Sequence, residues 1–413
     1  MSIAVVVYGR AGDLADRLER LRGPVTIVRH CDELTEVIAL AESGLADAAL
    51  LLGPAIDLDA AFADELAFHG VPAVAITDDH DDAERLAGLG LGVEPTTASE
   101  QSISDLLELL ATGTPRPARG ARHASSSKPV PAEHPLLDPG RILAVWGPTG
   151  STGKTIVAVN LAAEAAIVGQ RVLLVDADTY GSSVAVHLGL LDESAGIAQL
   201  CRLSDQGMLD DAGFERSCAV VAVGGATLRV ATGLPRPHRW PELRSGALTR
   251  VLDFVRRRVD LVVVDVASVL ERDEDLTYDT SAPQRNGAGL AVLESASEII
   301  AVGSADSVGV PRLVKGLEEL REILPEADPR VVLNRVRRSS VGPSPERALR
   351  ETWERFGPDG AIAGMLPADP EAADRALLQG SVLAEVAPDS ELRARIAGLI
   401  SVPIRRRTGL FSR

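Results

Sequence analysis

Several residue types that often build special sites are scarce in this sequence. Its 413 residues include three cysteines, Cys31, Cys201 and Cys218, and none stands in a Cys-x-x-Cys pair. This usage indicates a reducing compartment and argues against a structural zinc or iron–sulfur centre. The seven histidines lack the spacing of a metal-ligand set. Aromatic residues make up only 3% of the chain, so the core must be built from Ala, Val, Leu and Ile, which suits buried parallel strands.

Long hydrophobic runs and net positive charge are also missing. No apolar run approaches the roughly 18 residues that span a bilayer. The first residues, Met-Ser-Ile-Ala-Val-Val-Val-Tyr, lack the basic region of a signal peptide. We therefore expect a cytoplasmic protein that begins with a strand. The net charge of −17 argues against a chain that mainly coats nucleic acid, because such binding needs clustered positive charge.

Residues 1–111 alternate between strand-like and helix-like segments. Strands are expected at Ile3–Tyr8, Val25–Val28, Ala48–Leu52 and Val71–Ile76, and helices at Leu14–Leu21, Leu34–Ala41, Leu58–Phe68, Ala83–Leu89 and Ile103–Leu110. This rhythm predicts a small parallel sheet with helices on both faces. It resembles a flavodoxin-like receiver domain, with a generic α/β domain as the open alternative. The third strand runs into Gly53-Pro54, so the aspartate that accepts phosphate in working receivers is missing, which implies an interaction domain.

The rest of the chain divides into three parts. Residues 112–139 are rich in Pro, Ser, Gly and Arg without an apolar period, which predicts a flexible linker. Residues 140–401 predict a second, doubly wound α/β domain with a mostly parallel sheet, which binds ligands at the carboxyl ends of its strands. Its near-continuous Val/Leu/Ile runs predict strands that are buried on both faces. Residues 402–413 form a basic tail. Strands of the second domain are expected at Ile142–Trp146, Val172–Val175, Ala219–Val223, Leu261–Val264, Glu298–Val302, Arg330–Leu333 and Ala361–Met365.

The most informative segment runs from Gly147 to Thr155 and reads Gly-Pro-Thr-Gly-Ser-Thr-Gly-Lys-Thr. It lies between a strand-like and a helix-like run, which is the arrangement of a phosphate-binding loop (P-loop). The backbone N–H groups of such a loop and the N-terminus of the helix favour an anion. Lys154 adds a charge for the β- and γ-phosphates, and the Thr155 hydroxyl is a ligand for Mg²⁺. Lys154 is one of only three lysines in an arginine-rich chain, which indicates a chemical choice.

The spacing within the loop identifies a branch of the P-loop proteins. Pro148 stands at the first glycine of the usual Gly-x-x-x-x-Gly-Lys-[Ser/Thr] pattern, so that pattern fails by one residue. The loop fits better the deviant form Lys-Gly-Gly-x-Gly-Lys-Thr, aligned on residues 149–155, which is typical of the MinD/ParA family. Four further segments between residues 140 and 400 resemble this family in order: Asp176-Ala-Asp178, the strand ending at Asp265, Asn334-Arg335 and Pro367-Ala368-Asp369.

The resemblance implies a Mg-ATP site. Lys154 and Asp178 would be catalytic, with Asp178 orienting the water that attacks the γ-phosphate. Thr155, Asp265 and Asp176 would hold Mg²⁺, and Asp176 would also hold the loop. Asn334 suits an adenine edge, with a turn or cap residue as the open alternative. The implied nucleotide-binding residues are Gly147, Thr149, Gly150, Ser151, Thr152, Gly153, Lys154, Thr155, Ile156, Asn334, Pro367 and Asp369.

The chain departs from the family at Thr149, where relatives carry a signature lysine that reaches the phosphates of a dimer partner. Hydrolysis stimulated by dimer closure is therefore in doubt, and Arg285 is a candidate for an arginine supplied in trans. The tail combines three arginines with Leu410 and Phe411, which suits acidic lipid, but Pro403 and Gly409 oppose a helix. Peripheral membrane contact and a frayed soluble tail both remain open.

A receiver-like domain joined to a MinD/ParA-like ATPase resembles the CpaE/TadZ group and a related septum-site-determining group. The resemblance implies a slow ATPase that forms a nucleotide-dependent homodimer. It would localise or recruit protein partners of a membrane-associated machine, in pilus assembly, secretion or cell division. Two alternatives remain. One is a ParA-like DNA-partition ATPase, which the acidic balance disfavours. The other is an ATP-binding scaffold with little turnover, which Thr149 would explain.

Overall fold

The computed structural model describes residues 3–9, 25–111, 139–190, 195–272 and 283–400. The chain divides into two compact units, Met1–His134 with Arg202–Asp210, and Pro135–Cys201 with Asp211–Arg413. The helix expected at Leu14–Leu21, the tail, and all of the expected linker except residue 139 lie outside the described residues. Within the described ranges no helix combines the length and the apolar character needed to cross a membrane.

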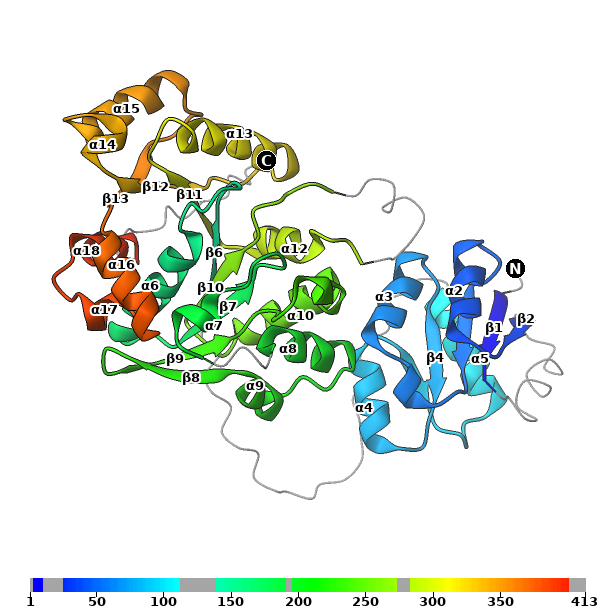
Figure 1. The fold of residues 1–413 in the computed structure, drawn as a ribbon. Helices are drawn as coiled ribbons and strands as arrows, with labels where there is room; N and C mark the ends of the chain where they lie inside the picture. Colours follow the sequence, from blue (N-terminus) through cyan, green and yellow to red (C-terminus); the bar gives the residue numbers. More distant parts are fainter. Residues whose placement is uncertain (1–2, 10–24, 112–138, 191–194, 273–282, 401–413) are drawn as a thin grey trace, which may run out of the picture. The chain divides into compact units, whose positions relative to one another are not determined.

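The first unit contains a five-stranded parallel sheet in the order β2-β1-β3-β4-β5 (Figure 1). Its strands are β1 (Ile3–Tyr8), β2 (Val25–Cys31), β3 (Ala48–Leu51), β4 (Ala73–Ile76) and β5 (Gly92–Glu94). Its helices are α2 (Leu34–Glu42), η1 (Ala55–Asp57), α3 (Ala60–Phe68), α4 (His80–Gly88) and α5 (Glu100–Ala111). This strand order is the flavodoxin-like one, so the predicted fold class is confirmed. Strand β5 and the short helix η1 were not predicted, because three residues show no measurable period.

Helices cover both faces of this first sheet. Because successive side chains of a strand point to opposite faces, Val6 and Tyr8 pack with α2, α3 and α4, while Val5 and Val7 pack with α5. Both sets are buried. The short apolar strands thus contribute side chains to two small hydrophobic cores, one on each face of the sheet.

The second unit contains an eight-stranded sheet in the order β13-β12-β11-β6-β10-β7-β9-β8. Its strands are β6 (Arg141–Trp146), β7 (Val172–Ala177), β8 (Ala219–Val223), β9 (Ala226–Ala231), β10 (Leu261–Val266), β11 (Glu298–Ser304), β12 (Arg330–Val336) and β13 (Ile362–Pro367). The helices from residue 139 onward are α6 (Lys154–Ile167), α7 (Val184–His187), α8 (Gly196–Asp205), α9 (Asp211–Ser217), η2 (Pro237–Glu242), α10 (Ser245–Val255), α12 (Gly287–Ser295), α13 (Gly309–Ile323), α14 (Arg338–Val341), α15 (Pro345–Phe356), α16 (Pro370–Gln379), α17 (Leu383–Val386) and α18 (Glu391–Ile400). All strand pairs are parallel except β8–β9. The mostly parallel, doubly wound sheet is confirmed.

One expectation about this sheet is wrong. Ala219–Val223 was expected to be buried on both faces, but β8 is an antiparallel edge strand whose residues alternate between partly buried and exposed. It forms a hairpin with β9, which was not predicted. The turn is Gly224-Gly225, and both residues have positive φ (55° and 84°). A Gly-Gly pair between two apolar runs is a hairpin signal that the sequence did contain.

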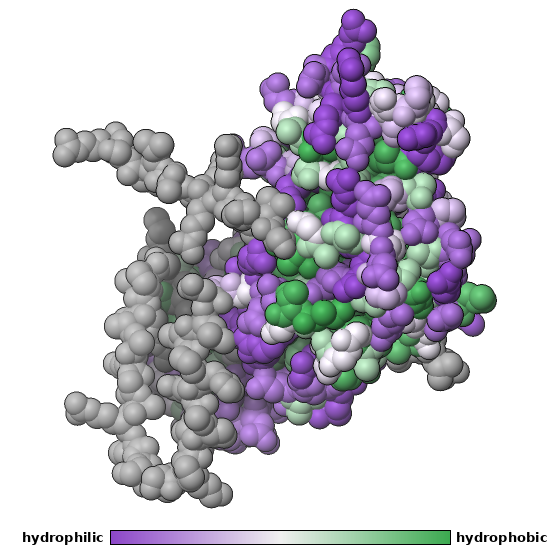
Figure 2. Space-filling model, turned by 90° about the vertical axis from the view of Figure 1, so that its left-hand side faces the viewer, coloured by the Kyte–Doolittle hydropathy of each residue, from purple (hydrophilic) through white to green (hydrophobic). Residues whose placement is uncertain are grey.

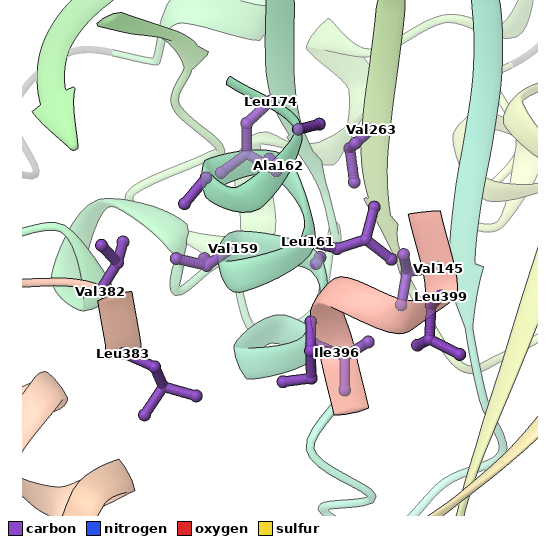
Figure 3. Packing of buried hydrophobic residues seen from close by; sticks show 14 of the residues in the cluster. Val145, Val159, Leu161, Ala162, Leu174, Val263, Val382, Leu383, Ile396 and Leu399 are labelled. Carbon is purple, nitrogen blue, oxygen red and sulfur yellow. The ribbon is translucent and has the colours of Figure 1, made fainter. Parts of the chain in front are cut away.

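Helix α6 is the centre of the second core. Ten of its fourteen residues are buried, and a helix that is apolar on nearly all sides must be covered on nearly all sides. Figure 3 shows Leu161 and Ala162 of α6 beside Val145 and Val263 of the sheet. Helices α17 and α18 complete this cover with the apolar side chains Val382, Leu383, Ile396 and Leu399. The loop before α6 is therefore held between two well-packed elements.

The opposite face of the sheet is covered by other helices. Trp146 points away from α6, and Gly316 of α13 lies close to its ring. Helix α12 contacts β6, β7 and β10. On the side of the molecule in Figure 2 the described residues are mostly hydrophilic, with smaller hydrophobic areas among them.

Candidate functional site

The loop between β6 and α6 has the backbone of an anion site. Strand β6 is the point where the chain order of the sheet reverses, so the loop opens into the crevice where such sheets bind ligands. Gly150, Ser151 and Gly153 have positive φ values of 110°, 34° and 86°. The first intrahelical bond of α6 runs from Val157 N to Gly153 O (3.2 Å). The N–H groups of the first helical residues, 154–156, thus have no acceptor within the helix and are available to an anion.

Asn334 braces this loop. Its Nδ2 donates to Thr152 O (2.9 Å), and its Oδ1 accepts from Arg335 N (2.8 Å). A Cβ on Gly153 would overlap Asn334 Nδ2, so this glycine is needed for close approach as well as for its positive φ. The contacts match the alternative reading of Asn334 as a turn residue. One amide hydrogen is left over for a ligand, so the adenine role stays a prediction.

Lys154 lies at the start of α6 with its side chain only 10% exposed. Its Nζ donates to Val266 O (2.6 Å) and Ser268 Oγ (3.0 Å), and it lies 3.5 Å from Asp178 Oδ2. The ammonium is thus held at the carboxyl end of β10, within reach of the loop it follows. Sequence reasoning missed Ser268, although a hydroxyl three residues beyond Asp265 was a visible signal.

Asp265 forms the clearest candidate metal ligand. It is fully buried, and its Oδ2 accepts from Thr155 Oγ1 (2.6 Å). Its Oδ1 is buried and has no hydrogen-bond partner. Burial raises the pKa of Asp265, while Lys154 and the Thr155 hydroxyl act to lower it. An orphaned carboxylate oxygen next to a threonine hydroxyl fits a hydrated Mg²⁺, which prefers oxygen ligands.

Asp176 pairs in register with Asp265 on the neighbouring strand. Its Oδ2 accepts from Ser183 N (2.9 Å) and Val184 N (3.0 Å), and its Oδ1 from Asp178 N (3.2 Å). Burial raises the pKa of Asp176 and nearby Asp265 raises it further, while these N–H donors oppose the shift. Asp176 therefore holds the loop before α7. Its expected roles toward the P-loop and a metal stay predictions. Ser183, which also lies 3.3 Å from Thr155 Oγ1, was not predicted.

Asp178 faces the same crevice. Its Oδ1 accepts from Tyr180 N (2.9 Å) and Gly181 N (3.0 Å), which leaves Oδ2 directed at Lys154. Its side chain is 15% exposed. The structure thus brings Lys154, Thr155, Asp178 and Asp265 together, and their roles toward a phosphate and a metal stay predictions.

Arg285 is engaged with its own chain. Its guanidinium donates to Pro237 O and Thr179 O (both 3.1 Å) and stacks 4.0 Å from the centre of the Tyr180 ring. To reach the nucleotide of a second copy, Arg285 would first have to break these contacts. The geometry instead ties the residues after Asp178 to η2.

The late motif lies at the carboxyl end of β13. Pro367 pairs with Val336 of β12. Asp369 caps α16 by accepting from Ala372 N (3.1 Å), and its second oxygen accepts from Ser390 Oγ (2.7 Å). Both oxygens of Asp369 are therefore committed to the fold, and contact of either residue with a nucleotide stays a prediction.

The remaining predicted residues lie along the loop. Gly147 follows β6 and lies close to the Val302 carbonyl, and Thr152 is buried with its hydroxyl unpartnered. Thr149 and Ser151 are exposed. Ile156 lies in the first turn of α6 and offers only its backbone N–H to a ligand.

Comparison with known proteins identifies the family of the second unit. Residues 143–381 match the model of the CobQ/CobB/MinD/ParA nucleotide binding domain. EpsB of Ralstonia solanacearum, named as a tyrosine-protein kinase, is 30% identical over 230 residues, which cover 53% of this chain and 28% of EpsB. The antiactivator FleN of Pseudomonas aeruginosa is 33% identical over 135 residues, covering 32% of this chain and 44% of FleN. The chain thus spans less than half the length of both relatives.

A solved structure shares the fold. The crystal structure of a ParA family ATPase from Chlorobium tepidum TLS has a TM-score of 0.53 and 18% identity, and the match covers 63% of this chain and 99% of that one. This likeness concerns the fold of the second unit.

Proposed function

Because this chain belongs to the CobQ/CobB/MinD/ParA nucleotide-binding family, we propose that it is a Mg-ATP-dependent switch that hydrolyses ATP slowly. The observation that carries the proposal is the convergence of four groups at one loop. The Lys154 ammonium, the Thr155 hydroxyl and the Asp178 and Asp265 carboxylates lie within hydrogen-bond or ion-pair distance of one another or of shared neighbours. Together these groups can bind a phosphate, coordinate a divalent cation and orient a water molecule.

Each group has a separate task in the proposed reaction. Lys154 exchanges its bonds to Val266 O and Ser268 Oγ for phosphate oxygens, which the N–H groups of the loop also bind. Thr155 and Asp265 hold Mg²⁺, which would supply charge neutralisation for the phosphates. Asp178 accepts a hydrogen bond from the attacking water and orients it toward the γ-phosphate.

The biological role that we propose is regulation by position. The resemblance to CpaE/TadZ and septum-site-determining proteins supports a dimeric switch that recruits partners of a membrane-associated machine. The flavodoxin-like first unit supports the same role, since it would offer an interaction domain in the same chain as the ATPase. The name of FleN, an antiactivator, places a regulator among the relatives.

The first test measures binding. Titration calorimetry with Mg-ATP should detect binding to the full chain, and Lys154→Ala should weaken it about a hundredfold, because two charge-assisted contacts are lost. Lys315→Ala removes an exposed lysine of α13 and should change nothing. If the unchanged chain binds neither adenine nor guanine nucleotides, the proposal fails.

The second test measures turnover. Asp178→Ala should keep Mg-ATP binding but lower phosphate release at least about tenfold, because positioned acid–base groups contribute that much or more. If the unchanged chain binds Mg-ATP and releases no more phosphate than the variant, the ATP-binding scaffold is the correct alternative. Salt-sensitive retention on DNA would instead support a partition ATPase.

A further inference from the structure

A cavity of about 180 Å³ lies beside the P-loop, on the side where Thr149 and Gly150 are exposed. One wall is the loop itself, and the other is the connection from β11 into α13 together with Arg335 of β12. The lining residues are Pro148, Thr149, Gly150, Thr152, Ser304, Asp306, Val308, Gly309, Arg312 and Arg335. None of these positions on α13 or β11 was singled out by the sequence, and the proposed reaction does not use them.

Arg312 lies directly against the loop. A Cβ on Gly150 would be 2.7 Å from Arg312 Nη1, and Gly150 also has a φ of 110°. In the ranges that the structure describes, the Arg312 guanidinium has no hydrogen bond or ion pair, and the residue is exposed. An uncommitted, always charged group therefore lies in contact distance of the backbone that forms the anion site.

The single carboxylate that lines the cavity, Asp306, does not neutralise its two arginines. Asp306 accepts hydrogen bonds from Ser304 Oγ (2.6 Å), Val308 N (3.0 Å) and Gly309 N (2.8 Å), which tie its carboxylate to the start of α13. The bond from Ser304, followed by those from the backbone, lowers the pKa of Asp306, so it carries one negative charge. Arg312 and Arg335 bring two positive charges. The residues that line the cavity thus carry a net positive charge, and the Arg312 guanidinium is the one placed against the loop.

We propose that Arg312 binds a phosphate oxygen of the nucleotide held in the P-loop, from within the same chain. It would supply the positive charge that Thr149 cannot supply. This rests on the proposed function, because it needs a nucleotide in the loop. A planar guanidinium suits a phosphate because it donates two parallel hydrogen bonds. A cation in cis would also allow phosphate contact without a second copy, unlike a lysine that crosses a dimer interface.

The experiment compares two arginines of α13 in the full chain. Arg312→Ala should raise the Kd for Mg-ATP about tenfold, since one charge-assisted contact is lost. Arg321→Ala, which removes another exposed arginine near the end of the same helix, should leave the Kd within about twofold. Arg312→Gln keeps more of the side-chain length while removing the charge and should match Arg312→Ala. Thermal unfolding should not change in any of these variants, because the positions are exposed.

A charge relocation gives a second readout. Adding Thr149→Lys to the Arg312→Ala variant should recover most of the lost affinity when two copies associate, because the new ammonium of one copy reaches the phosphates that its partner binds. A merely structural role of Arg312 would not be rescued in this way.

The outcomes distinguish a failure of the nucleotide site from a failure of the role proposed for Arg312. If Lys154→Ala abolishes binding while Arg312→Ala and Arg312→Gln behave like Arg321→Ala, the site is correct and the role of Arg312 is wrong. If the affinity falls but Thr149→Lys restores nothing, the idea that the two positions share one task is wrong. If the unchanged chain does not bind Mg-ATP, both proposals fall.

Discussion

The two sheets of this protein are built alike and end differently. In both, parallel strands are covered by helices on each face, and the carboxyl ends of the strands meet along one edge. In the second sheet β7 and β10 carry Asp176 and Asp265 at this edge, beside Lys154 and Thr155. In the first sheet β1 and β3 end at Tyr8 and Leu51. The carboxyl edge of a parallel sheet thus provides a location for a binding site. The residues at the strand ends decide whether such a site can bind a ligand there.

The Tyr8 ring occupies the space next to Gly53, just beyond β3. Any Cβ at Gly53 would overlap the Tyr8 ring, whose hydroxyl donates to Asp57 Oδ2 (3.3 Å). Tyr8 itself is buried. An aromatic ring therefore fills the space just beyond β3, where the resemblance to receivers would place the acceptor aspartate. The role of this unit as an interaction domain stays a prediction.

The largest effect that we expect concerns how the second core is closed. Arg393 of α18 donates from Nε to Glu164 Oε1 (2.6 Å) and from Nη2 to Oε2 (3.3 Å), and the Glu164 side chain on α6 is only 7% exposed. Arg393→Ala leaves this carboxylate buried without its cation and should cost about 3 kcal/mol of unfolding free energy, measured by urea denaturation.

Arg395→Ala is the matched control on the same helix. Arg395 forms exposed pairs with Glu391 and Glu346 and is itself 45% exposed. Such pairs contribute at most about 1 kcal/mol. Equal losses in the two variants would show that the Arg393 pair does not close the core.

An intermediate effect is expected in the first unit. Gly53→Asp should destabilise it by about 1–3 kcal/mol, because the new side chain must displace the packed Tyr8 ring. Combining it with Tyr8→Ala should cost less than the sum of the two single changes, because the clash is gone. Urea denaturation of the three variants provides the measurement. Strict additivity would contradict the claim that the ring occupies this position.

The smallest effect concerns pH. Burial lowers the pKa of His187 at the end of α7 below 6.5, so as pH falls the unfolded chain takes up this proton before the folded one. The folded state should therefore lose stability as pH falls below about 6.5. His187→Gln should show a shallower loss between pH 7.5 and pH 5.5 in the same denaturation assay. A steeper loss in the variant would reverse the sign that burial requires.

Local patterns predicted most of this architecture. Runs such as Leu261–Val264 indicated buried strands, and the segment ending in Lys154-Thr155 indicated the loop before α6, because each pattern lies within a few neighbouring residues. The Asp265 position followed from one carboxylate at the end of an apolar strand. The hairpin of β8 and β9 was missed even though its Gly-Gly turn was visible, since burial on both faces was inferred from composition alone.

Other contacts leave no trace in a local pattern. Asn334 bonds Thr152 across 182 positions of sequence, and Arg312 reaches Gly150 from the helix that follows β11. Both roles depend on which strands become neighbours in the sheet, and no spacing along the chain encodes that.

The sequence by itself determined the two α/β folds, the anion-binding loop and the identity of its lysine and carboxylates, because period, glycine placement and charge are local properties. Tertiary structure alone decided that an aromatic ring fills the edge of the first sheet and that Arg312 lies against the loop of the second. Packing brings distant segments within a few ångströms of each other. Only at such distances can the charge or the volume of one side chain affect the other segment.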